Sequence, residues 1–401
     1  MRNIVDSTKC YDAWLKKQLK ADLVQKDLRE KHKKMAQEPF LFLRATYWRW
    51  AETMLEVCPE LAGPQVLAVG DIHLENFGTW RDADGRLIWG VNDFDEAARM
   101  PYALDIVRLA TSAVLAEVTG ASKRKICESI LDGYRAGIKD PKPFILDREN
   151  PELRAISIVD DAARTKFWKK FDPEEIDNEP PKNVTPLSPG RLPPHYGQVL
   201  KRSRPDRSVS FRYFGRAGGT GSLGRPRIFG SGAWRGDLIV REAKAIVPSG
   251  WVLAHGGSPR LRCEEIATGK YRAADPTCRL YGRILVRRLS PNDFKIEAKQ
   301  EDAKRGRKSK NKAAKVVQEN PKAVARPKLV NARMLFDMGR EIAAIHCGTP
   351  NCTKAIAADL RRREDGWLRT AVKNASRSIR KDFAKWRAYY DKHEKRADDA
   401  A

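Results

Sequence analysis

The sequence predicts an α+β protein in which helical segments surround two separate β-rich stretches. Apolar residues recur at three- and four-residue steps near both ends of the 401-residue chain, in residues 11–37 and 367–395. Short runs rich in β-branched residues occur at 66–69 and 87–91, and further strand patterns lie within 201–294. Hydrophobic residues make up 41% of the chain, which is enough to build a large core.

The composition points to an anionic partner. The chain holds 77 Lys or Arg against 52 Asp or Glu, and the resulting net charge of +25 suits nucleic acid, a membrane surface or a small anion such as a nucleotide. Residues 295–330 contain 12 of the basic residues and only 4 acidic ones. We therefore expect a basic low-complexity linker there, with nucleic acid as its candidate partner.

The number of cysteines and the lengths of the apolar runs predict the cellular compartment of the protein. The seven cysteines are scattered and odd in number, so we expect no disulfide framework and a reducing environment. No stretch approaches 18 apolar residues, and the first residues lack the apolar core of a signal peptide. The sequence thus predicts a cytoplasmic protein without a membrane span.

The most informative stretch is 66–97, in which each of two predicted strands ends in a polar cluster. The clusters contain Asp71, His73 and Asn76 after the first strand and Asp93 and Asp95 after the second. An Asp-Gly turn between the strands predicts a hairpin, which would bring the clusters together. One Asp, an Asn five residues later and a further Asp after the next strand form the arrangement that phosphoryl transfer requires.

A second candidate site lies within 201–294. A predicted strand at 209–215 leads into a glycine-rich turn, and a cationic strand follows at 238–247. Glycine lets backbone amides approach phosphate, and a cation would neutralise its charge. The expected phosphate contacts are Gly218, Gly219, Gly221, Ser222, Gly224 and either Arg241 or Lys244. The two cations lie three residues apart and project to opposite faces of a regular strand, so only one of them can reach phosphate.

Two candidate sites are thus predicted, and the chain resembles known families in both of them. Residues 70–76, Gly-Asp-Ile-His-Leu-Glu-Asn, look like the G-D-x-H-x-x-N loop of aminoglycoside and choline kinases, and residues 93–95 stand where those enzymes carry a metal-binding motif. Over about residues 40–356 the chain resembles the bacterial family called domain of unknown function 2252, thought to be kinase-like. The short motifs that carry this resemblance lie at 42–44, 70–78, 92–96, 105–110 and 221–224.

The resemblance implies a two-lobed, protein-kinase-like fold. Ordinary kinases have the glycine loop before the catalytic loop, whereas here it follows, so the fold would be circularly permuted. We expect a helical catalytic-lobe part at 1–200 that includes the metal hairpin, and a β-rich nucleotide-lobe part at 201–294. The basic linker at 295–330 would lead to C-terminal helices at 331–401 that pack on the catalytic lobe.

The implied activity is Mg²⁺- and ATP-dependent phosphoryl transfer to an unknown hydroxyl acceptor. Asp71 would position or deprotonate the hydroxyl, and His73 would bind substrate or brace the loop. Asn76 and Asp93 would ligate Mg²⁺, with Asp95 as a second or alternate ligand. One alternative is a non-catalytic pseudokinase whose basic segment binds nucleic acid. Another is a metal-dependent hydrolase that uses the same carboxylates.

Four further residues have open roles. Arg44 lies in an apolar segment and needs a carboxylate or a phosphate as its partner. Asp105 and Arg108 are three apart on a predicted helix and are expected to pair, although kinases also use an Asp of the helical lobe to brace the catalytic loop. His346, near the end of a predicted helix, would either cap or pack that helix or face the site.

Overall fold

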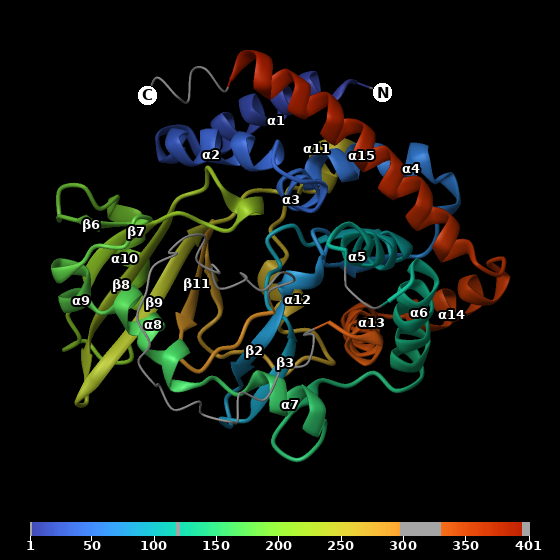
Figure 1. Ribbon diagram of the computed structural model, residues 1–401. Helices are drawn as coiled ribbons and strands as arrows, with labels where there is room; N and C mark the ends of the chain where they lie inside the picture. Colours follow the sequence, from blue (N-terminus) through green and yellow to red (C-terminus); the bar gives the residue numbers. More distant parts are fainter. Residues whose placement is uncertain (1, 118–120, 297–329, 395–401) are drawn as a thin grey trace, which may run out of the picture.

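The computed structural model describes residues 2–117, 121–296 and 330–394. Its strands form a six-stranded, a three-stranded and a two-stranded sheet, surrounded by helices (Figure 1). The prediction of an α+β protein is therefore confirmed. Within the described residues, no helix combines the length and the apolar character needed to cross a membrane. The seven cysteines are all free thiols.

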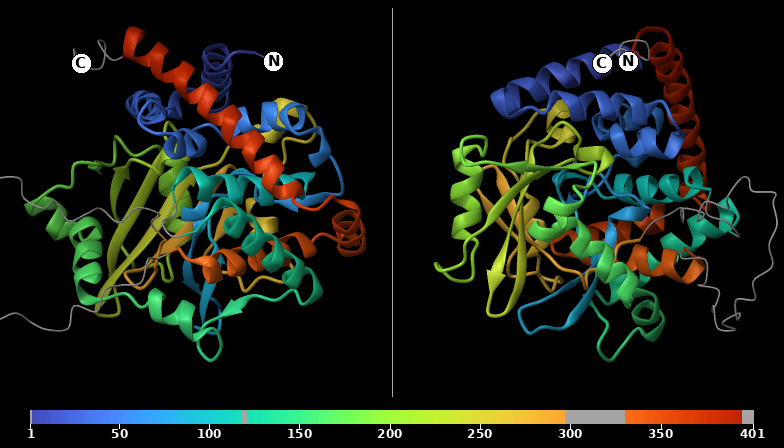
Figure 2. Two further views of the ribbon diagram at one scale, coloured as in Figure 1. Left: turned by 45° about the vertical axis from the view of Figure 1, so that its right-hand side comes forward. Right: turned by 60° about the vertical axis from the view of Figure 1, so that its left-hand side comes forward.

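Four helices form the N-terminal layer, and the long C-terminal helix lies across them (Figure 2). They are α1 (Ile4–Leu19), α2 (Gln25–Met35), α3 (Pro39–Ala45), α4 (Tyr47–Val57) and α15 (Trp367–His393). The apolar pattern at 11–37 predicts one helix, and this prediction is wrong, because the chain breaks at Lys20, which adopts a φ of 52°. The break turns Val24 toward the glycine-rich loop, where its N–H donates to the carbonyl of Gly224 at 3.0 Å.

The helical core is built on α5 (Ala103–Leu115), every residue of which is buried. Helices α6 (Lys123–Lys139) and α13 (Ala332–Cys347) pack against it, and α14 (Cys352–Arg362) packs on α6 and α13. Helices α6 and α13 approach each other closely at Gly133, Gly137 and Gly339. A Cβ placed on Gly133 would lie 1.8 Å from the carbonyl oxygen of Phe336 on α13, so only glycine fits there.

Replacing Gly133 with Ala should therefore force the two helices apart and lower the free energy of unfolding by about 3 kcal/mol. Gly190 is the matched control, since a Cβ there meets nothing within 4 Å. Gly190→Ala should change stability by no more than about 0.5 kcal/mol. Urea denaturation of the two variants measures the difference, and equal midpoints would contradict the close helix packing.

Two small antiparallel sheets position the acidic loops. One pairs β1 (Gln65–Ala68) with β4 (Ala98–Pro101), and the other orders β2 (Phe77–Arg81), β3 (Leu87–Val91) and β5 (Phe144–Ile145). The hairpin predicted between 66–69 and 87–91 is therefore wrong in its first strand. The Asp-Gly turn joins β2 to β3, and the intervening strand β2 was not predicted. The two acidic loops still meet, because β1–β2 and β3–β4 connect the same pair of sheets.

The third sheet is antiparallel throughout, in the order β10-β11-β9-β8-β7-β6. Its strands are β6 (Val184–Leu187), β7 (Arg212–Arg216), β8 (Arg227–Trp234), β9 (Asp237–Ala245), β10 (Arg279–Tyr281) and β11 (Ile284–Leu289). The shorter helices are α7 (Pro151–Ser157), α8 (Asp161–Phe171), α9 (Pro173–Asn178), α10 (Pro194–Arg202), α11 (Gly250–His255) and α12 (Cys263–Ala267).

Helices α8 and α9 cover one face of this sheet. Phe171 and Ile176 pack there against Phe214, Phe229 and Val240 in a small core separate from the main one. Strand β6 and these helices pack with the six-stranded sheet although they precede residue 201 in the chain. Most of the basic segment predicted at 295–330, namely 297–329, lies outside the described residues.

Candidate functional site

The loop between β1 and β2 carries Asp71, and helix α5 holds it from behind. The carboxylate of Asp105 accepts hydrogen bonds from the N–H groups of Val69 at 2.7 Å and Gly70 at 3.0 Å. Its partner on the other side is the ring of His346, 3.1 Å away and fully buried. The expected pair between Asp105 and Arg108 is therefore wrong, and the loop-bracing role is the one that the structure shows. His346 packs behind the loop and does not face the site.

Gly70 allows this loop to turn. It adopts a φ of 82°, and a Cβ there would lie 2.4 Å from the carbonyl oxygen of Glu96 in the second acidic loop. Glycine is thus required both by the backbone conformation and by the close approach of the two loops.

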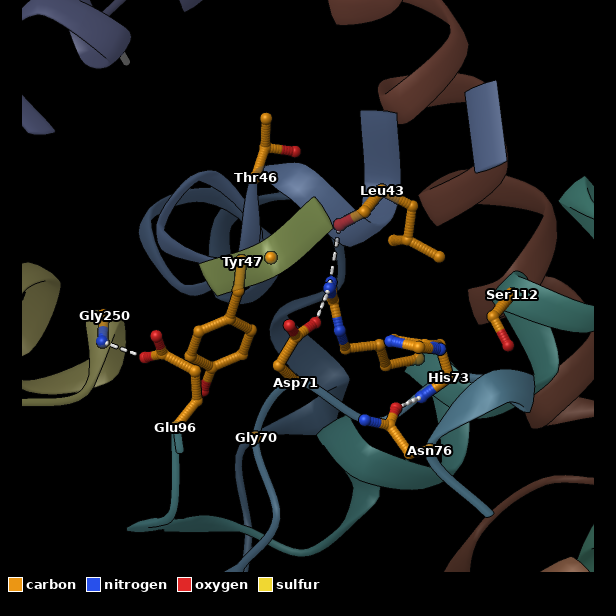
Figure 3. A network of polar contacts seen from close by, with 12 residues as sticks. Leu43, Thr46, Tyr47, Gly70, Asp71, His73, Asn76, Glu96, Ser112 and Gly250 are labelled. Atoms are coloured by element: carbon orange, nitrogen blue, oxygen red, sulfur yellow. Dashed lines mark hydrogen bonds and ion pairs between the residues drawn. The ribbon is translucent and has the colours of Figure 1, made fainter. Parts of the chain in front are cut away.

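Arg108 pairs instead with Asp71. Its guanidinium donates to Asp71 and to the carbonyl oxygen of Leu43 at 2.9 Å. Dashed lines at Asp71 and Leu43 in Figure 3 mark these two hydrogen bonds. Burial raises the pKa of Asp71 to about 6, although Arg108 opposes that rise. The Asp71 carboxylate is therefore ionised at neutral pH, and its pKa is close enough to neutral pH for it to accept a proton.

His73 and Asn76 fix the shape of the same loop. The side-chain oxygen of Asn76 accepts from the N–H of His73 at 2.7 Å (Figure 3). Nδ1 of His73 accepts from the N–H of Glu75 at 3.1 Å. Burial and the nearby Arg44 hold the pKa of His73 well below its ordinary value. His73 is consequently neutral, and of its two expected roles the structure shows loop bracing. The oxygen of Asn76 keeps a second lone pair for a ligand.

The loop between β3 and β4 carries Asp93 and Asp95, and Lys244 of β9 pairs with both. The Lys244 ammonium lies 3.0 Å from Asp93 and 2.5 Å from Asp95. Burial raises the pKa of Asp95, and the neighbouring Asp93 charge adds to that rise. For Asp93 burial acts in the same direction, but Lys244 outweighs it and leaves the pKa of Asp93 below its ordinary value. The Asp93 side chain is 37% exposed, so it can still accept a ligand from the cavity.

The two candidate cations of the strand, Arg241 and Lys244, lie in different surroundings. As their odd spacing predicts, the two side chains lie on opposite faces of β9. Arg241 donates to the carbonyl of Ser203 at 3.3 Å, just beyond α10, and faces away from the acidic loops. Lys244 is the residue at the site, but its partners are carboxylates.

The glycine-rich loop between β7 and β8 closes over Asp71. A Cβ on Gly221 would lie 3.0 Å from the Asp71 carboxylate and 3.0 Å from the Arg44 carbonyl oxygen. The carbonyl of Gly221 accepts from the buried Lys31 at 2.9 Å. Gly224 lies apart from the site, since the atoms nearest to a Cβ there would belong to Leu15, Leu28 and Leu23.

Residues of the two acidic loops and of the glycine-rich loop line one cavity of about 90 Å³. From the predicted site it includes Asp71, His73, Asn76, Asp93, Asp95, Gly219, Gly221 and Ser222. Gly218 instead lines an adjoining surface groove between α2 and the sheet. Arg44 also lines the cavity and pairs with Glu75 at 2.6 Å, so of its two possible partners the structure shows a carboxylate.

A second, more apolar cavity of about 360 Å³ lies between the β2–β3 hairpin and the six-stranded sheet. Its aromatic side chains are Trp80, Phe94, Phe167 and Phe171. Asn92 and Lys295 line both cavities, so the two spaces adjoin.

The donors present suit a hard cation. Within the described residues no three His, Cys, Asp or Glu side chains gather as a metal cluster. Mg²⁺ needs no such cluster, because it is commonly bound by one or two carboxylates together with substrate phosphates and water. The Asp93 carboxylate and the Asn76 amide oxygen, which line the same cavity, fit that pattern.

Sequence reasoning missed several charged residues of the site. Arg225 lines the first cavity and pairs with Glu96 at 2.5 Å, while Arg216 and Arg227 border the glycine-rich loop. An arginine at each end of a glycine run was a usable signal. Nothing in the sequence pointed to Lys31, which lies 190 residues from its partner.

Comparison with protein families found one match. Residues 23–171 match a family described as "Uncharacterized protein conserved in bacteria (DUF2252)". The matched part includes both acidic loops and helix α5 but ends before the glycine-rich loop. A comparison with curated proteins found no match. A comparison with solved structures found none either.

Proposed function

We propose that the protein is a Mg²⁺- and ATP-dependent phosphotransferase that acts on a hydroxyl acceptor. One observation carries the proposal: Asp71, Asn76 and Asp93, from two different loops, line a single cavity beneath a glycine-rich loop. This grouping matches the parts that phosphoryl transfer needs, namely a carboxylate for the hydroxyl, oxygen ligands for a metal and a backbone loop for the phosphates.

The adjoining cavity is the candidate site for the nucleotide base. Its aromatic side chains offer apolar and stacking surface, which the small polar cavity lacks. The base would then lie against the β2–β3 hairpin, and the phosphates would extend toward the glycine-rich loop.

The residues of this chain divide the chemistry among them. The acceptor hydroxyl attacks the terminal phosphorus, the bond to the bridging oxygen breaks, and ADP leaves. Asp71 receives the hydroxyl proton, while Arg108 holds its carboxylate in position. Bound Mg²⁺ would neutralise charge on the phosphates, with Asp93 and Asn76 as its protein ligands and Asp95 in support.

The arrangement also supports a permuted, kinase-like organisation. The helical part contributes both acidic loops, the six-stranded sheet contributes the glycine-rich loop and Lys244, and the acidic loops come first in the chain. A circular permutation changes only where the chain begins and ends. Exposed positions of a protein tolerate such a change well. Seven free thiols fit a cytoplasmic location for such an ATP-dependent enzyme.

Titration calorimetry of the native protein with ATP tests the proposal. We expect ATP to bind in the presence of Mg²⁺ with micromolar to millimolar affinity, and adenosine to bind more weakly. Replacing Mg²⁺ with EDTA should weaken ATP binding. Absence of heat at millimolar Mg²⁺-ATP would refute the nucleotide site. Binding without ADP formation would instead favour a pseudokinase.

A further inference from the structure

We propose that the polyphosphate chain of the ligand is held by three arginines, Arg216, Arg227 and Arg287, rather than by Lys244. These residues, together with Glu242, are called the arginine cluster below. The inference depends on the proposed function only for the identity of the nucleotide, because the cluster itself predicts binding of any linear polyphosphate.

Glu242 of β9 organises the cluster. Its side chain is 0% exposed and receives hydrogen bonds from Arg216 at 2.6 Å, Arg287 at 2.9 Å and Arg227 at 3.2 Å. A single carboxylate therefore fixes the orientation of three guanidinium groups.

Strand register explains why these residues meet. Arg287 of β11 lies directly opposite Glu242, and Arg227 of β8 lies opposite Lys244, two residues further along β9. Side chains two apart on a strand share a face, and directly opposite residues on neighbouring strands do so as well. The cluster is thus a built feature of one sheet face.

The cluster carries more positive charge than it neutralises. Three guanidinium groups surround one carboxylate, and the arginine side chains are only 13%, 6% and 15% exposed. Burial lowers the pKa of Arg216 to about 10. The negative charge of Glu242 acts to raise this pKa, whereas the positive charges of Arg227 and Arg287 act to lower it. Largely buried positive charge in excess of the neighbouring negative charge is costly, so the cluster is suited to receive an anion.

Lys244 is less suited to that task. It is 3% exposed and already pairs with Asp93 and Asp95, so that group of three carries a net negative charge. A negative group fits a cation, whereas the positive arginine cluster next to it fits phosphate. The site therefore separates a metal side from a phosphate side.

The position of the cluster fits a chain of phosphates. Arg227 lines the small cavity, and Arg216 and Arg287 line the apolar one, so the cluster spans their junction. Arg227 also donates to the Ser222 hydroxyl at 2.9 Å and so links the glycine-rich loop to the cluster. Guanidinium forks bind phosphate oxygens in pairs, which a lysine cannot do.

The test uses inorganic tripolyphosphate in EDTA, which probes the cluster without base or metal. The native protein should bind it, and the double variant Arg216→Gln/Arg287→Gln should bind about 100-fold or more weakly, at roughly tenfold per arginine. Arg212→Gln is the matched control, since Arg212 lies on the same strand but pairs with the exposed Asp177 at 2.8 Å. That variant should bind like the native protein.

Unchanged tripolyphosphate affinity in the double variant would overturn the proposal. If the double variant does not fold, the thermal midpoint of the native protein decides, because tripolyphosphate should raise it and absence of a shift would also overturn the proposal. The two proposals fail separately. If the cluster variants bind Mg²⁺-ATP as tightly as the native protein does, the arginine cluster alone is rejected. If the native protein binds tripolyphosphate but not Mg²⁺-ATP, the nucleotide site alone is rejected.

Discussion

Asp93→Asn should remove the Mg²⁺ dependence of ATP binding and lower the rate of ADP formation by about 10³-fold or more. The substitution keeps the size of the side chain and one oxygen but removes the charge that faces the cavity. Asp95 cannot replace it fully, since it is 9% exposed and its pKa is raised by burial. The metal side of the site would then lose its most accessible carboxylate.

Calorimetry with and without Mg²⁺ measures this effect, and Asp237→Asn is a suitable control because Asp237 is an exposed residue at the start of β9. The unfolding midpoints of both variants show whether the fold persists. An Asp93→Asn protein that keeps the Mg²⁺ effect of the native protein would place the metal elsewhere.

Asp71→Asn should lower the rate of phosphoryl transfer by about 10²- to 10⁴-fold while changing the affinity for Mg²⁺-ATP by no more than about threefold. Asparagine can accept a hydrogen bond from the acceptor hydroxyl but cannot take its proton. ADP formation measures the rate, with water as the acceptor until a better one is found. Equal loss of binding and rate would show instead that Asp71 serves nucleotide capture.

The pH profile of the native protein gives a second test of Asp71. Since burial raises its pKa to about 6, the carboxylate is protonated below that pH and can no longer accept a proton. The rate should therefore rise with pH up to about 6 and level off above it. Mg²⁺-ATP binding should persist at pH 5, because Lys244 holds the pKa of Asp93 below its ordinary value. A rate that is flat from pH 5 to 8 would argue against Asp71 as the base.

The local motifs were predictable from the sequence because they depend on neighbouring residues. The Asp-Gly turn, the strand at 87–91 and the opposite faces of Arg241 and Lys244 all follow from local geometry. The break after α1 was not predictable in this way. The hydrogen bond that follows it joins Val24 to Gly224, which are 200 residues apart, so no local pattern indicates it.

The pairing of charged residues was the least predictable feature. Asp105 and Arg108 have the spacing of a helical ion pair, yet buried Asp105 binds backbone N–H groups while Arg108 reaches Asp71. A helix that is buried on all sides offers its charged residues partners from other segments, which outweigh a neighbour on the same helix. The arginine cluster was missed for the same reason, because its members come from four strands.

The most direct test is a crystal structure with Mn²⁺ and a non-hydrolysable ATP analogue. We expect an anomalous Mn²⁺ peak between Asn76 and Asp93, the triphosphate beneath the glycine-rich loop against the arginine cluster, and the base in the aromatic cavity. A metal peak away from both acidic loops, or a nucleotide outside the two cavities, would contradict the account.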